Sequence, residues 1–219
     1  MLVMLGLHLI FLHIPRTAGT SIRTHLKDNG GPHCELWGID ETHGDLAHID
    51  LSQLSRFVVI ADSSEYTVFC VVRNPLDRLV SAWRYMCVGE KGEKSVSFAA
   101  FVRSLDETDK GSWPIHARTQ CDFIDDARAR CEAGFRELVI LRYERLDRDY
   151  KFGIIDRYEL NGWLARLNGG DKGNGGNGGN AGNALNASND KPVIDDETRG
   201  IIERLYERDY RELGYDRQK

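Results

Sequence analysis

Two arginine-containing segments of this sequence combine residue types that bind anions. The first segment, PRTAGTS at 15–21, follows an apolar run and precedes a predicted helix. Small side chains let backbone N–H groups approach an anion, and the N-terminus of the following helix adds partial positive charge. The candidate ligands in this segment are Arg16, Thr17, Ala18, Gly19, Thr20 and Ser21. The alternative is a plain strand-to-helix turn with Thr or Ser capping.

The second segment is VVRNPLDRLVS at 71–81. Arg73 ends a predicted strand, and Ser81 lies about two turns into the helix that Pro75 opens. A guanidinium group can hold a phosphate through two hydrogen bonds, and a hydroxyl adds another. The alternative for Arg73 is an ion pair or a carbonyl cap, and Arg78 reads as a solvated helix charge. Two such sites at one sheet edge predict a ligand with two separated phosphate groups.

The elements that would position these residues alternate between strands and helices. The apolar or β-branched runs that predict strands are 7–14, 56–61, 67–73 and 136–144. The patterns that predict helices cover 20–27, 74–86, 97–107, 116–131, 154–167 and 195–215. We therefore expect an α/β fold with a mainly parallel sheet in three layers. Residues 1–219 are expected to form a single domain, with a flexible Gly/Asn-rich insertion at 168–190.

Composition excludes several classes of protein. The 219 residues carry a formal net charge of -5, which argues against a general nucleic-acid binder. The five cysteines are odd in number and form no C-x-x-C pair, which favours reduced thiols in the cytoplasm and argues against a zinc site. The apolar start, 1–14, lacks the basic region and cleavage site of a signal peptide and is too short to span a bilayer. We expect it to be the first, fully buried strand, and no other segment is apolar enough to span a membrane.

These segments resemble motifs of one enzyme family. FLHIPRTAGTSI at 11–22 resembles the 5′-phosphosulfate loop of sulfotransferases, H-I-P-K-T-[AG]-G-T, and VVRNPLDRLVSAW at 71–83 resembles their 3′-phosphate motif, V-R-[ND]-P-x-x-R-x-x-S. LRYERLDRDY at 141–150 and LYERDYRELGY at 205–215 resemble two further motifs of the glycan-type branch. The resemblance runs from about residue 9 to 215. It implies a P-loop-like sulfotransferase topology and transfer of a sulfuryl group from 3′-phosphoadenosine 5′-phosphosulfate (PAPS) to a hydroxyl of a carbohydrate or related acceptor, without a metal.

The resemblance also implies roles for individual residues. Residues 16–21 would hold the 5′-phosphosulfate, Arg73 and Ser81 would hold the 3′-phosphate, and Ser188 and Lys191 are candidates to complete the nucleotide pocket. Arg16 stands where the family has a lysine. Since an arginine side chain does not give up its proton in proteins, Arg16 is expected to stabilise negative charge without acting as a general acid.

The acceptor hydroxyl must lose a proton, and related enzymes often place a base between the two phosphate motifs. Histidine is suited to this role near neutral pH. That interval holds His25, His33, His43 and His48. The stretch ETHGDLAHIDL favours His43 and His48, with His43 ranked slightly ahead, and a surface or capping role is the alternative for each.

Acceptor contacts are expected in the stretch IHARTQCDF at 115–123, whose candidates are His116, Arg118 and Gln120. Trp83 and Trp113 could stack on sugar rings or pack in the core. Two other functions remain open: a catalytically degenerate member that binds the nucleotide or a glycan, and a P-loop-like kinase. The kinase is disfavoured because the G-K-[ST] lysine and an evident magnesium carboxylate are missing from the sequence.

Overall fold

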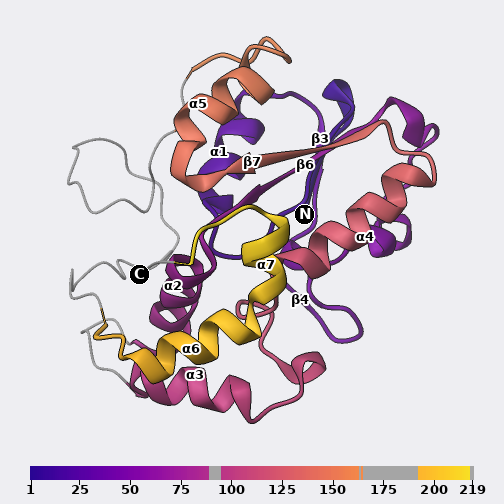
Figure 1. Ribbon diagram of the computed structural model, residues 1–219. Helices are drawn as coiled ribbons and strands as arrows, with labels where there is room; N and C mark the ends of the chain where they lie inside the picture. The colour runs from indigo at the N-terminus through magenta and orange to yellow at the C-terminus, as the bar shows by residue number, and fades with distance from the viewer. Residues whose placement is uncertain (89–94, 163, 165–191, 218–219) are drawn as a thin grey trace.

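The computed structural model describes residues 1–88, 95–162, 164 and 192–217. A five-stranded sheet in the order β3-β1-β2-β6-β7 forms its centre (Figure 1). Its strands are β1 (Leu2–Met4), β2 (Leu9–Phe11), β3 (His33–Glu35), β6 (Thr67–Val72) and β7 (Glu137–Arg142). A separate two-stranded hairpin is formed by β4 (Ile39–Asp40) and β5 (Gly44–Asp45).

The sheet is mixed rather than mainly parallel. Strands β2, β6 and β7 run parallel, whereas β1 pairs antiparallel with both β2 and β3. The difference arises at the N-terminus, because residues 1–14 form two strands and not one. A 3-10 turn at Leu5–Leu7, followed by His8 with a left-handed φ of 49°, folds Leu2–Met4 back onto Leu9–Phe11. Both strands are fully buried, as expected for the segment.

Helices cover both faces of the sheet, as the three-layer prediction requires (Figure 1). On one face, Phe11, Phe69 and Val71 pack against α1 (Gly19–Asn29) and against α5 (Leu146–Tyr150) with its π-helical extension (Lys151–Ile155). On the other face, strand residues such as Val68, Cys70 and Val72 pack against α4 (Gln120–Glu132) and against Leu213. Leu213 directly follows α7 (Glu207–Glu212).

A third apolar cluster lies where β6 runs into α2 (Pro75–Cys87). It joins α2, α3 (Phe98–Asp106) and α6 (Asp196–Leu205), which lie together at one end of the molecule in Figure 1. Trp83 and Trp113 are both buried in this cluster, so they pack in the core and do not present a ring to a sugar.

Besides the N-terminal strand, further predicted elements differ from the structure. The helix predicted at 195–215 is two helices, α6 and α7, with Tyr206 between them. Residues 57–61 form no strand, because the N–H groups of Phe57 and Val58 bond to the carbonyl of Leu54 and continue a 3-10 helix. The helix predicted at 154–167 is wrong in its bounds: the helical residues are Leu146–Ile155, whose buried stripe is Leu146, Tyr150 and Ile154, and residues 156–159 form turns; 163 and 165–167 lie outside the described residues. The 3-10 helices are Leu5–Leu7, Leu46–His48, Leu51–Arg56, Ser63–Glu65, Lys110–Ser112 and Tyr143–Arg145.

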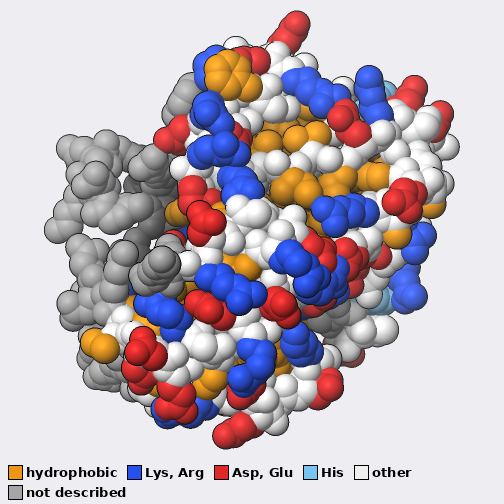
Figure 2. Space-filling model, in the orientation of Figure 1, with side chains coloured by type: hydrophobic (Ala, Val, Ile, Leu, Met, Phe, Trp, Pro, Cys, Tyr) orange, Lys and Arg blue, Asp and Glu red, His pale blue; other side chains and the backbone are white. Residues whose placement is uncertain are grey.

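The surface carries both signs of charge. On the face shown in Figure 2, Lys and Arg side chains alternate with Asp and Glu around α6 and α7 and form no single basic field. Within the described residues, no helix has the length and apolar character needed to cross a membrane.

Candidate functional site

The segments that follow β2, β6 and β7 meet at one edge of the sheet, because these three strands are parallel. Arg16 lies in the loop after β2, Arg73 directly follows β6, and Tyr143 directly follows β7. The Nη1 of Arg73 donates to the backbone carbonyl of Arg16 at 3.4 Å. Its guanidinium also lies 4.2 Å from the centre of the Tyr143 ring. The two arginine segments therefore form one site.

The backbone of the first loop has a conformation that suits an anion. Arg16 and Ala18 both have left-handed φ values, 68° and 73°, which are uncommon for residues other than glycine. Left-handed residues in such loops direct successive N–H groups into a concavity that binds anions. Ala18 is also the N-cap of α1 and offers no side-chain acceptor to the first N–H groups of the helix. A bound phosphate group would satisfy these donors, so the loop can hold an anion of that kind.

The Arg16 side chain is held by two residues one turn apart on α2. Its Nε–H donates to Ser81 Oγ at 3.1 Å, and its guanidinium lies 4.7 Å from the centre of the Tyr85 ring. The Nη groups have no hydrogen-bond partner among the described residues. Burial lowers the pKa of Arg16, but the group remains charged near neutral pH. Arg16 therefore offers a fixed cation with free donors.

Other residues of the first loop shape it. The Thr17 hydroxyl is buried and donates to the carbonyl of Ile14 at 2.7 Å, so it does not face solvent. A Cβ at Gly19 would lie 1.6 Å from Nε2 of His13, so only glycine leaves room for that ring. Thr20 is exposed and Ser21 is buried.

His48 belongs to a buried group of histidines beside this site. Its Nδ1 lies 2.7 Å from the carbonyl oxygen of His13. A carbonyl can only accept, so Nδ1 carries the proton and Nε2 is the free basic nitrogen of the neutral ring. The His48 ring lies 5.3 Å from His116, which lies 4.5 Å from Tyr85, the residue against which Arg16 packs. Contacts through Tyr85 thus connect Arg16 with the histidine group.

Burial keeps these histidines neutral. It lowers the pKa of His48 to about 4 and the pKa of His116 to about 4, and the nearby Arg16 acts in the same direction on both. Burial also lowers the pKa of His13 well below its ordinary range, with His48 as a further cause. His48 is therefore in its neutral, unprotonated form at neutral pH.

His43 lies elsewhere, at the β4–β5 hairpin. Its Nδ1 lies 2.8 Å from Asp40 Oδ1, its Nε2 lies 3.1 Å from Arg56 Nη1, and its ring packs on Phe57. Both ring nitrogens are thus engaged away from Arg16. The structure brings His48 to the arginine site and does not bring His43 there.

Asp45 lies beside His48, and Asp45, His48 and His116 have donor atoms within 4.8 Å of one another. Asp45 Oδ2 is 3.9 Å from His48 Nε2, whereas ligands of a tetrahedral Zn²⁺ lie about 3.3 Å apart given metal–ligand distances near 2 Å. The spacing suits proton transfer with a carboxylate near the resulting imidazolium better than it suits a bound metal. The sequence reasoning did not single out Asp45.

The three predicted acceptor residues have different surroundings. Only His116 joins the histidine group; its Nδ1 is buried and has no hydrogen-bond partner among the described residues. Arg118 pairs with Asp50, at 2.9 Å from Oδ1. Gln120 is fully buried and bonds to the backbone of Arg73, so it does not present its amide to solvent. Ser188 and Lys191 lie outside the described residues.

The sequence predicts Arg78 as a solvated helix charge, and this prediction is wrong. Arg78 is fully buried and donates to the carbonyl groups of His116 and Arg118, which fixes the acceptor stretch to α2. Tyr85 and Tyr143 were also missed by the sequence reasoning. The i, i+4 spacing of Ser81 and Tyr85 on a predicted helix would have pointed to Tyr85.

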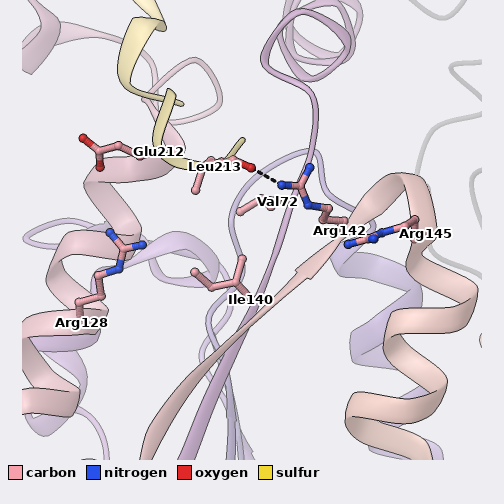
Figure 3. Close-up of a pocket in the computed structure, with 7 residues that line it drawn as sticks. All are labelled: Val72, Arg128, Ile140, Arg142, Arg145, Glu212 and Leu213. Atoms are coloured by element: carbon pink, nitrogen blue, oxygen red, sulfur yellow. Dashed lines mark hydrogen bonds between the residues drawn. The ribbon is translucent and has the colours of Figure 1, made fainter. Parts of the chain in front are cut away.

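A separate pocket lies near the same edge but on the α4 face (Figure 3). Its lining residues are Val72, Arg128, Ile140, Arg142, Arg145, Glu212 and Leu213. Side chains alternate along a strand, so Val72 and Ile140 face away from the side that Arg73 and Tyr143 reach. The pocket arginines have partners of their own, such as the Leu213 carbonyl for Arg142. This pocket is therefore not part of the Arg16–Arg73 site.

Comparison with known proteins agrees with this geometry. Residues 3–216 match the sequence profile of a family described as the sulfotransferase family. No curated protein and no solved structure gives a significant match to the chain.

Proposed function

Because this chain belongs to the sulfotransferase family, we propose that it transfers a sulfuryl group from PAPS to a hydroxyl of a carbohydrate or related acceptor. The observation that supports this most is the junction of the two phosphate segments. Arg16 bonds to Ser81 at 3.1 Å and its carbonyl accepts from Arg73 at 3.4 Å, so two cations and a hydroxyl share one site. A donor with separated 5′ and 3′ phosphate groups matches two such cations. When bound, PAPS supplies the activated sulfuryl group.

Each phosphate group has its own set of residues in this proposal. The N–H groups of the loop at 16–21 and the Nη groups of Arg16 hold the 5′-phosphosulfate, while Arg73 and Ser81 hold the 3′-phosphate. Thr17 and Gly19 maintain the loop conformation and do not contribute side-chain ligands. Ser188 and Lys191 remain candidates for the far side of the nucleotide. The strand–loop–helix order from β2 to α1 supports a P-loop-like topology.

Arg16 stabilises the negative charge that develops on the oxygen leaving with the nucleotide. Sulfuryl transfer, like phosphoryl transfer, depends mainly on in-line positioning and on charge stabilisation. A guanidinium provides that charge at all relevant pH values and donates no proton to the reaction. The leaving oxygen therefore departs as an anion held by Arg16.

His48 is the proposed base. With the donor bound, the free Nε2 of His48 would accept the proton of the acceptor hydroxyl as that oxygen replaced the nucleotide oxygen on sulfur, and Arg16 would hold the departing oxygen. Asp45, 3.9 Å from that nitrogen, stabilises the imidazolium that forms. The buried Nδ1 contact with His13 fixes the orientation of the ring. His43 is the second candidate and is less favoured because both its nitrogens are engaged at the hairpin.

The acceptor is proposed to approach along His116, which lies between His48 and Tyr85. Arg118 could meet an anionic group of the acceptor if it exchanged its pairing with Asp50.

The five cysteines are unpaired, which favours a reducing compartment such as the cytoplasm.

The proposal is tested by incubating the purified protein with radiolabelled PAPS and a panel of neutral and acidic glycans. Transfer of label to a glycan, lost in Arg73→Met, supports the enzyme. Binding of 3′,5′-adenosine bisphosphate without transfer to any acceptor supports the degenerate alternative. Phosphate transfer from ATP–Mg²⁺ with no binding of the bisphosphate would establish the kinase instead.

A further inference from the structure

The backbone of Arg73 is held on both sides by one buried amide. The Arg73 N–H donates to Gln120 Oε1 at 2.8 Å, and Gln120 Nε2 donates to the Arg73 carbonyl at 2.8 Å. Gln120 is fully buried at the first position of α4. Arg73 directly follows β6, and its backbone N–H and carbonyl pair with this side-chain amide in place of a neighbouring strand. The two hydrogen bonds fix the direction in which Arg73 leaves the sheet.

A buried carboxylate on α7 fixes the orientation of that amide. Asp209 Oδ2 accepts from the backbone N–H of Gln120 at 2.9 Å and from Nε2 of Gln120 at 3.3 Å, while Oδ1 accepts from the Cys121 N–H at 2.9 Å. Asp209 is fully buried. An ionised carboxylate accepts only, so it selects the amide rotamer that turns Nε2 toward Asp209 and Oε1 toward Arg73.

The next residue of the second segment is held in a similar way. Glu144 Oε1 accepts from the Asn74 N–H at 2.6 Å, and Glu144 Oε2 accepts from the Tyr215 hydroxyl at 2.9 Å. Asp209 and Tyr215 both belong to the C-terminal segment that resembles a family motif. The C-terminal segment thus acts on the second segment at two points. Asp209 acts on Arg73 through Gln120, and Tyr215 acts on Asn74 through Glu144.

We propose that Gln120 and Asp209 are positioning residues that set Arg73 for the 3′-phosphate of the donor, so that α7 controls the preference for 3′-phosphorylated nucleotides. The inference rests on the proposed function, because it takes Arg73 as the 3′-phosphate ligand. Neither residue touches the nucleotide. Their contribution passes through the Arg73 backbone. Loss of either one leaves the contacts of the first loop to Ser81 and Tyr85 in place and affects that loop only through the 3.4 Å bond from Arg73 to the Arg16 carbonyl.

The test compares two ligands that differ by one phosphate group. Calorimetry would give the dissociation constants of 3′,5′-adenosine bisphosphate and of adenosine 5′-phosphate for the wild type, Arg73→Met, Gln120→Met and Asp209→Asn. The wild type should prefer the bisphosphate by roughly tenfold or more, since charge-assisted hydrogen bonds contribute about 1.5–3 kcal/mol. Gln120→Met and Asp209→Asn should lose most of that preference, as Arg73→Met does, with adenosine 5′-phosphate bound nearly as before.

Three further variants keep the test decisive. Gln120→Glu has nearly the same volume and keeps the oxygen that accepts from the Arg73 N–H, but it loses the N–H that donates to the Arg73 carbonyl. This variant should therefore also reduce the preference for the bisphosphate. Pairing it with Asp209→Asn restores a donor opposite the new carboxylate and should recover part of the preference. Glu207→Gln, a mostly exposed change on α7, is the matched control and should alter neither constant.

The outcomes separate the two proposals. A wild type without preference for the bisphosphate overturns the proposed function and this inference with it. A wild type with that preference, together with folded Gln120 and Asp209 variants that keep it, overturns the inference alone. Equal weakening of both nucleotides in these variants also overturns it, because that result indicates a general structural role.

Discussion

The Nε–H of Arg16 donates to Ser81 Oγ over 3.1 Å and joins the loop after β2 to the helix after β6. The sequence motifs assigned these two residues to different phosphate groups, yet the structure places them in contact. A lysine at position 16 would have to use its only charged group to reach Ser81, whereas arginine uses Nε and keeps both Nη groups for a ligand. The contact thus gives a physical reason why arginine can serve where the family has lysine.

We predict that Arg16→Met lowers kcat/KM for sulfuryl transfer by roughly 10²–10³-fold, the usual cost of removing a donor that stabilises a developing anion. Arg16→Lys keeps the charge but loses the Ser81 contact, so it should retain a larger share of the activity. Steady-state kinetics with the same acceptor checks both variants. Unchanged rates in both would show that Arg16 does not stabilise the leaving oxygen.

The two candidate bases should differ strongly. His48→Asn, which retains a donor near the His13 carbonyl, should lower kcat by roughly 10²–10⁴-fold, since the general base is lost. His43→Asn is the matched control on the hairpin and should change kcat only slightly. A large loss in His43→Asn with an active His48→Asn would transfer the role of base to His43.

The pH dependence of activity should follow the lowered pKa of His48. With a pKa of about 4, the free base is present throughout the neutral range, so kcat/KM should fall only as the pH drops toward 4. The measurement is a pH profile of kcat/KM with a control for unfolding at each pH. An acidic limb centred near pH 6.5, the value of an ordinary histidine, would contradict the buried position of the base.

Stability should also decrease at acid pH because His48 and His116 are buried in neutral form. Their pKa values in the folded protein, about 4, lie below the unfolded value near 6.5, so the unfolded chain binds protons first as pH falls. Their stabilising contribution is complete above pH 6.5 and is lost between pH 6.5 and 4, on the order of 3 kcal/mol for His48. Urea unfolding at several pH values gives the free energy of unfolding as a function of pH. This free energy should change less steeply with pH in His116→Gln than in the wild type. Equal slopes would argue against the lowered pKa of His116.

Gly19→Ala should destabilise the protein by about 1–3 kcal/mol, because the new Cβ would overlap the His13 ring. The double variant Gly19→Ala/His13→Ala should cost less than the sum of the two single changes. A double-mutant cycle on unfolding free energies measures this coupling. Simple additivity would show that the His13 ring does not pack on the start of α1.

The sequence predicted the parts of the fold that depend on local pattern. The strand at 67–73 and the helix opened by Pro75 were confirmed, because a continuous apolar run and an N-terminal proline are strong local signals. The 3-10 turn at Leu5–Leu7 was missed because no proline or polar pair interrupts the apolar run. The strand predicted at 56–61 has the right composition, but its backbone bonds to Leu54, and Val59 is left in solvent.

For the candidate site, the sequence predicted that the two arginine segments lie at one sheet edge, and the structure brings them together there, but the sequence could not show their surroundings. Arg78 was predicted to be a solvated helix charge and Gln120 an acceptor contact, and both are fully buried. Arg78 bonds to carbonyl groups 38 and 40 residues away along the chain, and Gln120 bonds to Asp209, which is 89 residues away. Contacts between segments so far apart depend on tertiary packing, which a single sequence does not reveal.

In the proposed function, Arg16 and Arg73 together hold a nucleotide with separated 5′ and 3′ phosphate groups. Calorimetric titration with 3′,5′-adenosine bisphosphate and, in parallel, with ATP–Mg²⁺ tests it most directly. The titration should show one selective site for the bisphosphate that is weakened in both Arg16→Met and Arg73→Met. The bisphosphate at 100 times its dissociation constant should stabilise the protein by about 2.7 kcal/mol. Binding of ATP–Mg²⁺ with no binding of the bisphosphate would contradict it.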